Sequence, residues 1–263
     1  MKKYNPSNID LTKYIFFTGK GGVGKTSIAC ATAVNLADSG KKVLLISTDP
    51  ASNLQDVFNL DLNNKGTQIK EVPNLTVVNL DPEQAAAEYR ESVVAPFRGG
   101  KLPESVITNM EEQLSGSCTI EIAAFNEFSD FITNQEKRKD YDFIIFDTAP
   151  TGHTLRMLQL PSAWNTFIAE NTTGASCLGQ LSGLEDRKEV YKNAVSTLSD
   201  SKQTTLILVS RPDESPLREV ERSSNELLDL DIISQNLIIN GVLENYDEND
   251  TVSKQIYERQ QNA

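Results

Sequence analysis

The run Tyr14-Ile15-Phe16-Phe17-Thr18-Gly19-Lys20-Gly21-Gly22-Val23-Gly24-Lys25-Thr26 decides the fold of this chain. Its last eight residues match the pattern G-x-x-x-x-G-K-[ST], with an apolar strand-like segment before them and an Ala- and Ile-containing helical segment after them. Glycines let backbone amides turn inward around an anion, and a helix that begins there presents its positive end to the same anion. The run therefore predicts a strand, a phosphate-binding loop and a helix. A glycine-rich turn that binds nothing is the alternative.

Strand-like and helix-like segments alternate along the chain, which is typical of an α/β fold: a doubly wound, mostly parallel sheet flanked by helices. We expect strands at 14–18, 43–47, 75–80, 143–146, 205–209 and 237–239. We expect helices at about 25–38, 83–95, 103–114, 119–135, 154–170, 184–199, 215–229 and 248–262. Helices fill about 82–140 without an isolating linker, so we predict a single domain over 1–263 with a helical insertion. The last helix lacks a cap or a following strand, which favours a truncated C-terminus.

Composition excludes several classes of protein. The 263 residues include 25 Lys+Arg and 37 Asp+Glu, a net charge of −12, which argues against nucleic acid as a partner because phosphate backbones bind to basic surfaces. No apolar run approaches the roughly 18 residues of a membrane span, and the N-terminus lacks the apolar region of a secretory signal. Three cysteines at irregular spacing predict no disulfide framework. We therefore expect a cytoplasmic protein.

Two aspartates follow predicted strands on the side where the loop lies. Asp147 ends an apolar run and Asp49 follows the predicted strand at 43–47, so both are expected at the carboxyl edge of the sheet. We expect Thr26 and Asp147 to hold Mg²⁺ and Lys25 to neutralise phosphates. Asp49 is placed to orient an attacking water. For each aspartate the alternative is a carboxylate that caps a turn. For Lys20, spacing alone favours a solvated surface lysine as much as a residue that binds the ligand.

The loop GKGGVGKT resembles the deviant Walker A motif xKGGxGK[ST] of MinD, ParA, nitrogenase iron protein, the tail-anchored-protein targeting ATPases and the ArsA ATPases. Within that group the chain most resembles the ArsA family of arsenite-stimulated ATPases. The stretches that carry the resemblance are 19–26, STDPASNLQDVF at 47–58, LSGSCTIEIAAFNEF at 114–128, DTAPTGHTLRMLQLPSAW at 147–164 and ASCLGQLSGLE at 175–185. The last three are specific to the ArsA family. The resemblance implies a P-loop NTPase fold and Mg²⁺-dependent hydrolysis of ATP.

The resemblance also implies roles for individual residues. Lys20 would reach the nucleotide across a face-to-face interface with a second ATPase unit, and it would act in catalysis with Lys25 and Asp49. Thr26, Asp49 and Asp147 would hold Mg²⁺, with Asp49 in the switch I loop and Asp147 at the start of switch II. The nucleotide-binding residues would be Gly19, Lys20, Gly21, Gly22, Val23, Gly24, Lys25, Thr26, Ser27 and Asn240, the last of which would contact adenine.

Metalloid binding is implied by the same resemblance. Trivalent arsenic and antimony are thiophilic, and Cys118 and Cys177 fall in ArsA-like stretches. Taken alone, Cys118 and Cys177 are more readily interpreted as small buried apolar side chains. The match of their surroundings to ArsA favours metalloid ligands instead. His153, in switch II, is interpreted as a weak ligand or a coupling residue, with a surface hydrogen bond as the alternative. Cys30 is expected in the core. ArsA ATPases usually hold two such units, so we expect the third thiol and the partner of Lys20 from another chain or a second half.

The leading functional hypothesis is therefore an ATPase that drives extrusion of arsenite or antimonite through an integral membrane efflux subunit. The metalloid would be an activating ligand, and the ATPase would lie peripherally at the inner face of the membrane. The alternative is a tail-anchored-protein targeting ATPase, for which a Met-rich groove and a C-x-x-C pair are expected. This chain has three methionines and no two cysteines close together. A MinD- or ParA-like positioning ATPase would need a basic tail or basic patches, and residues 250–263 are mixed in charge.

Overall fold

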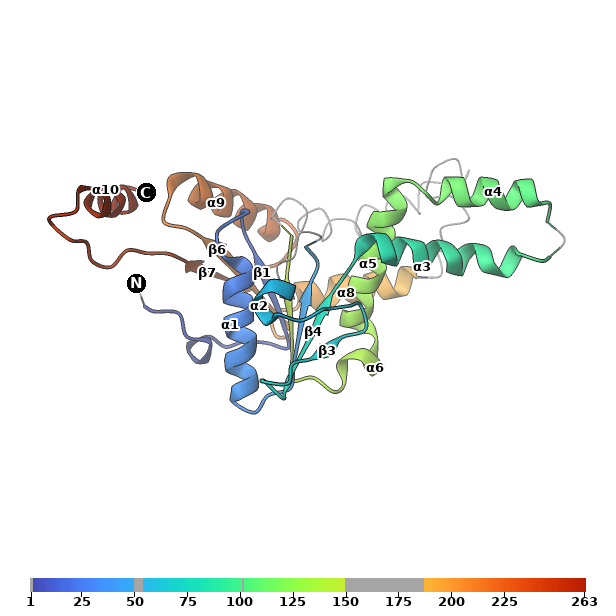
Figure 1. Ribbon diagram of the computed structural model, residues 1–263, viewed down its shortest axis with the longest axis horizontal. Coiled ribbons are helices and arrows are strands. Elements are labelled where there is room, and N and C mark those ends of the chain that lie inside the picture. The colour runs from blue at the N-terminus through green and yellow to red at the C-terminus, as the bar shows by residue number, and fades with distance from the viewer. Residues whose placement is uncertain (1, 50–53, 101, 150–186) are drawn as a thin grey trace.

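A computed structural model describes residues 2–49, 54–100, 102–149 and 187–263 (Figure 1). Within these residues the strands form one seven-stranded sheet in the order β3-β4-β2-β5-β1-β6-β7. In that order their bounds are Thr67–Gln68, Leu75–Asn79, Val43–Ser47, Phe143–Asp147, Tyr14–Thr18, Thr204–Ser210 and Gln235–Ile239. Neighbouring strands are parallel except for β3 and β4, which are antiparallel. The predicted doubly wound α/β sheet is confirmed.

Helices cover both faces of this sheet, which explains why every residue of β1 is buried. Side chains alternate along a strand, so Tyr14 and Phe16 enter one core cluster and Ile15 and Phe17 enter the other. In the first cluster the ring of Phe16 stacks on that of Phe146 from β5, with the ring centroids 4.5 Å apart. The continuous apolar strands read from the sequence are therefore the buried centre of a two-sided core.

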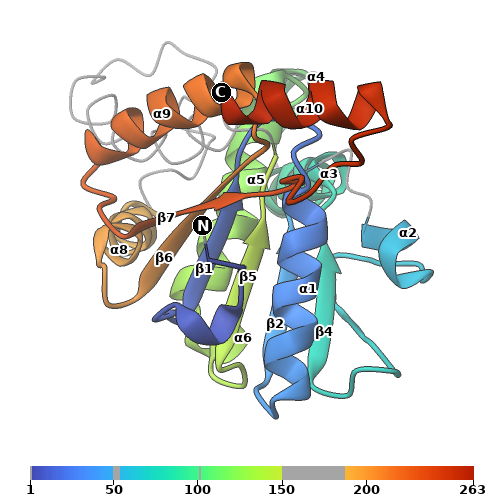
Figure 2. The same ribbon diagram turned by 90° about the vertical axis from the view of Figure 1, so that its left-hand side faces the viewer.

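Different helices supply the two sides. On one side α1 (Lys25–Asp38) contributes Ala29 and Ala33. On the other side the sheet packs against α5 (Ser117–Thr133), α8 (Lys188–Ser199) and α9 (Glu214–Leu228). Figure 2 shows α1 in front of the sheet and α5 behind it. The C-terminal helix α10 (Thr251–Gln261) has no buried residue. The sheet edge near the start of α1 is thus framed by α1 on one side and by α9 on the other.

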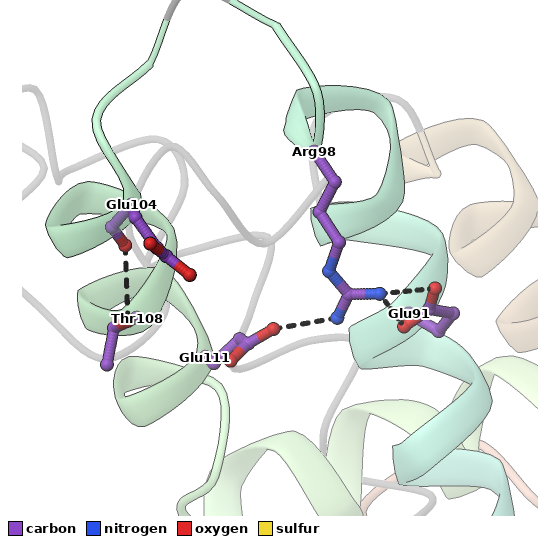
Figure 3. Close-up of polar contacts among 5 residues, drawn as sticks. All are labelled: Glu91, Arg98, Glu104, Thr108 and Glu111. Carbon is purple, nitrogen blue, oxygen red and sulfur yellow. Dashed lines mark hydrogen bonds and ion pairs between the residues drawn. The ribbon is translucent and has the colours of Figure 1, made fainter.

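Two of the helices between β4 and β5 extend away from the sheet (Figure 1). Here α3 (Pro82–Val94) runs through the 3₁₀ turn η2 (Ala95–Phe97) and a loop into α4 (Glu104–Gln113), and α3 and α4 lie side by side (Figure 1). Arg98 joins the two helices, because its guanidinium donates to both carboxylate oxygens of Glu91 at 2.6 and 2.7 Å and to Glu111 at 2.7 Å (Figure 3). A single domain over 1–263 with an insertion at about 82–140 stays a prediction.

Some elements differ from the sequence expectations. The short elements η1 (Pro6–Asn8), α2 (Leu54–Phe58) and β3 were not predicted. The helix expected at 119–135 ends at Thr133, because the side chain of Asn134 accepts a hydrogen bond from the backbone N–H of Glu136 at 2.9 Å and caps a separate helix, α6 (Gln135–Arg138). The helix expected at 154–170 and the start of the one expected at 184–199 lie outside the described residues.

Candidate functional site

The carboxyl ends of the central strands meet at one edge of the sheet, and the phosphate-binding pattern lies there. In the parallel register Asp147 of β5 is paired with Phe17 of β1 and with Ser47 of β2. Strand β6 runs along the other side of β1, with Leu208 opposite Thr18. The segments that leave β1, β2, β5 and β6 therefore share this edge, where open α/β sheets bind their ligands.

The loop at 19–24 is fixed by close contacts at two glycines. A Cβ atom at Gly19 would lie 2.1 Å from the carbonyl oxygen of Val209 at the end of β6. Gly24 has a φ of +95°, and a Cβ atom there would lie 2.3 Å from Nδ2 of Asn240. The same Nδ2 donates to the carbonyl oxygen of Val23 at 2.9 Å. Because Gly24, the N-cap of α1, has no side chain to satisfy the first helical amides, these amides are available to an anion.

The other loop residues named from the sequence differ in exposure. Gly21, Gly22 and Ser27 are exposed. The Val23 side chain is 2% exposed and belongs to the core cluster that contains Ala29 of α1. Val23 therefore offers only its backbone to a ligand, a distinction that the motif alone does not make.

Lys25 is the buried cation of the site. Only 6% of the residue is exposed, and its Nζ donates to the carbonyl oxygen of Lys20 at 3.4 Å. Burial lowers the pKa of the Lys25 ammonium, while the negative charges of Asp147, Asp49 and Glu219 oppose that shift. An anionic phosphate placed against α1 would supply the counter-charge that this buried ammonium requires.

Thr26 and Asp147 form the pair on which a magnesium site depends. The Thr26 hydroxyl donates to Oδ2 of Asp147 at 2.7 Å, and Asp147 is fully buried. Its other oxygen, Oδ1, is buried with no hydrogen-bond partner among the described residues. Burial raises the pKa of this carboxyl to about 6, against the lowering effects of Thr26 and Lys25. An unpartnered buried carboxylate oxygen beside a hydroxyl suits the oxygen ligands and bound waters that Mg²⁺ prefers, so these residues fit the ion.

Asp49 is the second carboxylate at this edge. It raises the pKa of both Lys25 and Asp147, so its charge acts on the same small region. Its backbone N–H donates to Oγ of Ser47 at 3.2 Å, and the next N–H toward the strand, from Thr48, donates to the carbonyl oxygen of Asp147 at 3.0 Å. The segment after β2 is therefore tied to the end of β5, and the structure brings Asp49 together with Lys25 and Asp147.

Lys20 points elsewhere. Its Nζ donates to Oγ of Ser215 at 2.7 Å and lies 3.8 Å from Oε2 of Glu219, both on α9. No sequence signal identified Ser215 or Glu219, since they lie almost two hundred positions from the loop and only the packing of α9 beside β6 brings them to it. The two lysines of the loop thus have different partners, Lys25 on the loop itself and Lys20 on α9.

The residues expected to bind metalloid are only partly described. Cys177 and His153 lie outside the described residues. Cys118 belongs to the first turn of α5, and the structure does not describe its side chain. Cys30, on α1, is buried in the core, as predicted, and burial together with the charge of Asp147 raises the pKa of its thiol to about 12. Among the described residues no group of three or more His, Cys, Asp or Glu side chains could hold a metal ion.

Together, a parallel sheet, a glycine loop that opens a helix, and a Thr–Asp pair at the same edge define a nucleotide-binding protein of the P-loop NTPase class. Comparison with known families then identifies the particular one. Residues 12–263 match the model of the anion-transporting ATPases, the ArsA ATPase family, and the chain belongs to this family. The expected resemblance is confirmed over nearly the whole chain.

Similar curated proteins agree with this family. The chain is 51% identical over 255 residues to the arsenical pump-driving ATPase of Acidiphilium multivorum, an alignment that covers 97% of this chain and 44% of that protein. An arsenical pump-driving ATPase of Escherichia coli gives the same identity and coverage. The ATPase GET3 of Kluyveromyces lactis is 32% identical over 264 residues, covering 92% of this chain and 76% of that protein. The chain thus spans less than half the length of the arsenical pump-driving relatives.

No helix in the described part of the chain is long and apolar enough to cross a membrane.

Proposed function

We propose that this chain hydrolyses ATP with Mg²⁺ and that hydrolysis energises extrusion of arsenite or antimonite through an integral membrane partner. The observation that carries the proposal is the meeting of Lys25, the Thr26–Asp147 pair and Asp49 at one sheet edge. The identity of 51% to arsenical pump-driving ATPases supports the choice of transported substrate.

In this proposal the loop holds the triphosphate. The backbone amides of Gly19–Gly24 and the first turn of α1 surround the phosphate oxygens, and Lys25 neutralises the transferring group. Ser27 follows in the first turn of α1 and is exposed toward solvent. Asn240 supports the loop through the carbonyl group of Val23, which leaves the rest of its amide for the base. The buried position of Lys25 makes its charge effective, because little water screens it there.

Thr26, Asp147 and Asp49 form the acidic half of the proposed centre. The Thr26 hydroxyl and the free Oδ1 of Asp147 would hold Mg²⁺, with Asp49 near the same ion. Bound Mg²⁺ would neutralise the β- and γ-phosphate oxygens. Asp49 accepts the proton of the attacking water or orients that water in line with the leaving group. Lys20 of a second unit, either another copy or a second half, would stabilise the same transferring phosphate from across the interface.

Metalloid would couple two such units. Cys118 and Cys177 supply thiolates, His153 links them to the segment that follows Asp147, and a third thiol comes from the second unit. Capture of the metalloid would bring the units together and complete both catalytic sites. The ATPase then works in the cytoplasm, at the inner face of the membrane beside its efflux subunit.

The test is the rate of ATP hydrolysis with and without arsenite or antimonite, at chain concentrations that allow two units to associate. We expect stimulation of wild type and of the control variant Cys30→Ala, which alters a buried core thiol. We expect none in Cys118→Ser, because a hydroxyl is a poor ligand for a thiophilic metalloid. Equal stimulation of Cys118→Ser and wild type would contradict the metalloid site, and an unstimulated wild-type rate would contradict the coupling.

A second candidate function is delivery of a hydrophobic helix, as in a tail-anchored-protein targeting ATPase. The observation that favours it is a group of partly exposed apolar side chains where α3 leads into α4: Phe97, Leu102 and Val106, which are 40%, 41% and 38% exposed. Retention of a soluble peptide with an apolar C-terminal helix by wild type, but not by Phe97→Ser, would support this function. No retention by wild type would remove it.

A further inference from the structure

The partners of Lys20 carry an inference beyond the proposed ATPase chemistry. Lys20 belongs to the phosphate-binding loop, yet its ammonium donates to Ser215 at 2.7 Å and lies 3.8 Å from the carboxylate of Glu219. Ser215 and Glu219 are one helical turn apart at the start of α9, so both face the loop from the same side of that helix. The contact joins the loop after β1 to the helix after β6.

Glu219 faces the phosphate region as well as Lys20. Its negative charge raises the pKa of Lys25, so the carboxylate lies within electrostatic reach of the buried cation of the loop. The side chain of Glu219 is 24% exposed, which leaves its charge only partly screened. Neighbouring charges on α9 pair with each other: Arg218 with Glu214, and Arg222 with Glu226. Among the described residues Lys20 is thus the only basic side chain within ion-pair distance of Glu219.

We propose that Ser215 and Glu219 are positioning residues that hold the Lys20 ammonium on α9 of its own chain, and that a bound polyphosphate releases it. The physical reason is competition. A nucleotide triphosphate in the loop repels the Glu219 carboxylate and attracts the Lys20 ammonium, so the ligand weakens the Lys20–Glu219 pair. By linkage, the pair must weaken polyphosphate binding to the same extent.

The hold on Lys20 is independent of the proposed function, and only its consequence for a second ATPase unit rests on that function. In this proposal the Lys20 ammonium must leave Ser215 and Glu219 before it pairs with a phosphate of another unit. The hold on α9 would therefore keep Lys20 out of a second unit's site until nucleotide occupies the chain's own loop. The contact itself lies within one chain and can be tested without any hydrolysis.

The first test measures the reactivity of Lys20 toward a limiting amount of an amine acetylating reagent, read by peptide mass spectrometry with exposed Lys41 as the internal reference. Loss of a partly exposed ion pair corresponds to about a two- to fivefold change, so we expect Lys20 labelling to rise by that factor in Glu219→Gln and Ser215→Ala. The matched control is Glu221→Gln, which removes the same charge from an exposed position of α9. Wild-type labelling of Lys20 in both Glu219→Gln and Ser215→Ala, or an equal rise in Glu221→Gln, would overturn the proposal.

The second test is a double-mutant cycle on the affinity for ADP. We expect Glu219→Gln to bind ADP about two- to fivefold more tightly than wild type. Part of that gain in affinity comes from releasing Lys20, so the gain should be smaller in a Lys20→Gln background. A merely structural role of Glu219 would give the same gain in both backgrounds, and that result would contradict the proposal. If labelling behaves as expected but wild type binds no ADP, the hold on Lys20 stands and the proposed ATPase function fails. If wild type binds ADP tightly but labelling is unchanged in the α9 variants, the hold on Lys20 fails and the proposed ATPase function stands.

Discussion

At the scale of single residues, the proposed catalytic centre contains a carboxyl group whose surroundings disfavour its charged form. Asp147 is fully buried, hydrogen-bonded to Thr26 through one oxygen and unpartnered at the other among the residues that the structure describes. Burial of a carboxylate without a full set of partners costs stability, and proteins accept that cost mainly where a ligand later supplies the missing partner. The nearby ammonium of Lys25 lowers the pKa of Asp147 but does not restore its ordinary value.

This arrangement predicts a pH-dependent effect of Asp147→Asn on stability. The pKa of Asp147 rises from 3.8 to about 6 on folding, so its favourable protonated form is present below pH 3.8 and is lost as the pH passes 6. At roughly 1.4 kcal/mol per pKa unit, ionisation costs the metal-free wild type about 3 kcal/mol at neutral pH. Neutral Asn avoids that cost and keeps an acceptor for Thr26, so the variant should be more stable at pH 7 by up to this amount.

Urea unfolding of both proteins between pH 4 and pH 7.5, with the metal chelated, measures the difference. The gain should be near zero at the acid end and grow through pH 6. Added Mg²⁺ should stabilise wild type and leave Asp147→Asn unaffected. A variant that is less stable than wild type at pH 7 without metal, or a difference that does not change with pH, would contradict the burial argument.

At the scale of elements, the loop fits against the ends of three strands and the start of one helix because Gly19 and Gly24 have no side chains. Gly19 touches the carbonyl group of Val209 on β6, and Gly24 touches the amide of Asn240 after β7. The register of the parallel strands sets these contacts, with Phe17 beside Asp147 on one flank and Thr18 beside Leu208 on the other. The loop is therefore held by the sheet rather than by its own sequence alone.

A matched pair of glycine variants tests this view. Gly24→Ala would place a methyl group 2.3 Å from the Asn240 amide at a φ of +95°, whereas Gly21 has nothing within 4 Å of its Cβ position. We expect Gly24→Ala to cost about 1–3 kcal/mol of unfolding free energy in the absence of nucleotide, and Gly21→Ala to stay within ~0.5 kcal/mol of wild type. Thermal and chemical unfolding give the comparison. Equal losses in the two variants would show that the close contact with Asn240 does not hold the loop.

The elements also show how much of the fold and of the site can be predicted from the sequence. Strands β1 and β2 and helix α1 have the predicted bounds, since long apolar runs and a glycine before a helix are local signals. Short β3 was missed because a two-residue strand exists only through its pairing with β4. The meeting of Thr26 with Asp147 followed from the rule that parallel strands end at one edge. The contact of Lys20 with Glu219 could not be predicted, because it depends on how α9 lies against the loop.

At the scale of the whole molecule, the proposed catalytic residues gather at one sheet edge, and the described helices lie around that edge or project away from it. Helix α1 presents its N-terminus to the loop, α9 holds Lys20, and α3 and α4 project from the far end of the molecule (Figure 1). The net charge of −12 makes the buried Lys25 and the loop amides a local exception on an acidic protein. A site focused in this way would let an acidic protein bind phosphate without attracting polyanions in general.

The proposed hydrolysis of ATP at this edge is tested most sharply by the initial rate of phosphate release from ATP by the purified chain. The rate is measured as a function of Mg²⁺ for wild type, Lys25→Gln and Asp49→Asn. We expect a rate that requires Mg²⁺ and falls by about 10²-fold or more in each variant, the loss typical of removing a catalytic acid–base or charge-stabilising group. Asp49→Asn should still bind nucleotide, because it leaves the loop and Lys25 in place. Hydrolysis that proceeds without Mg²⁺, or that survives undiminished in Lys25→Gln, would contradict the proposed centre.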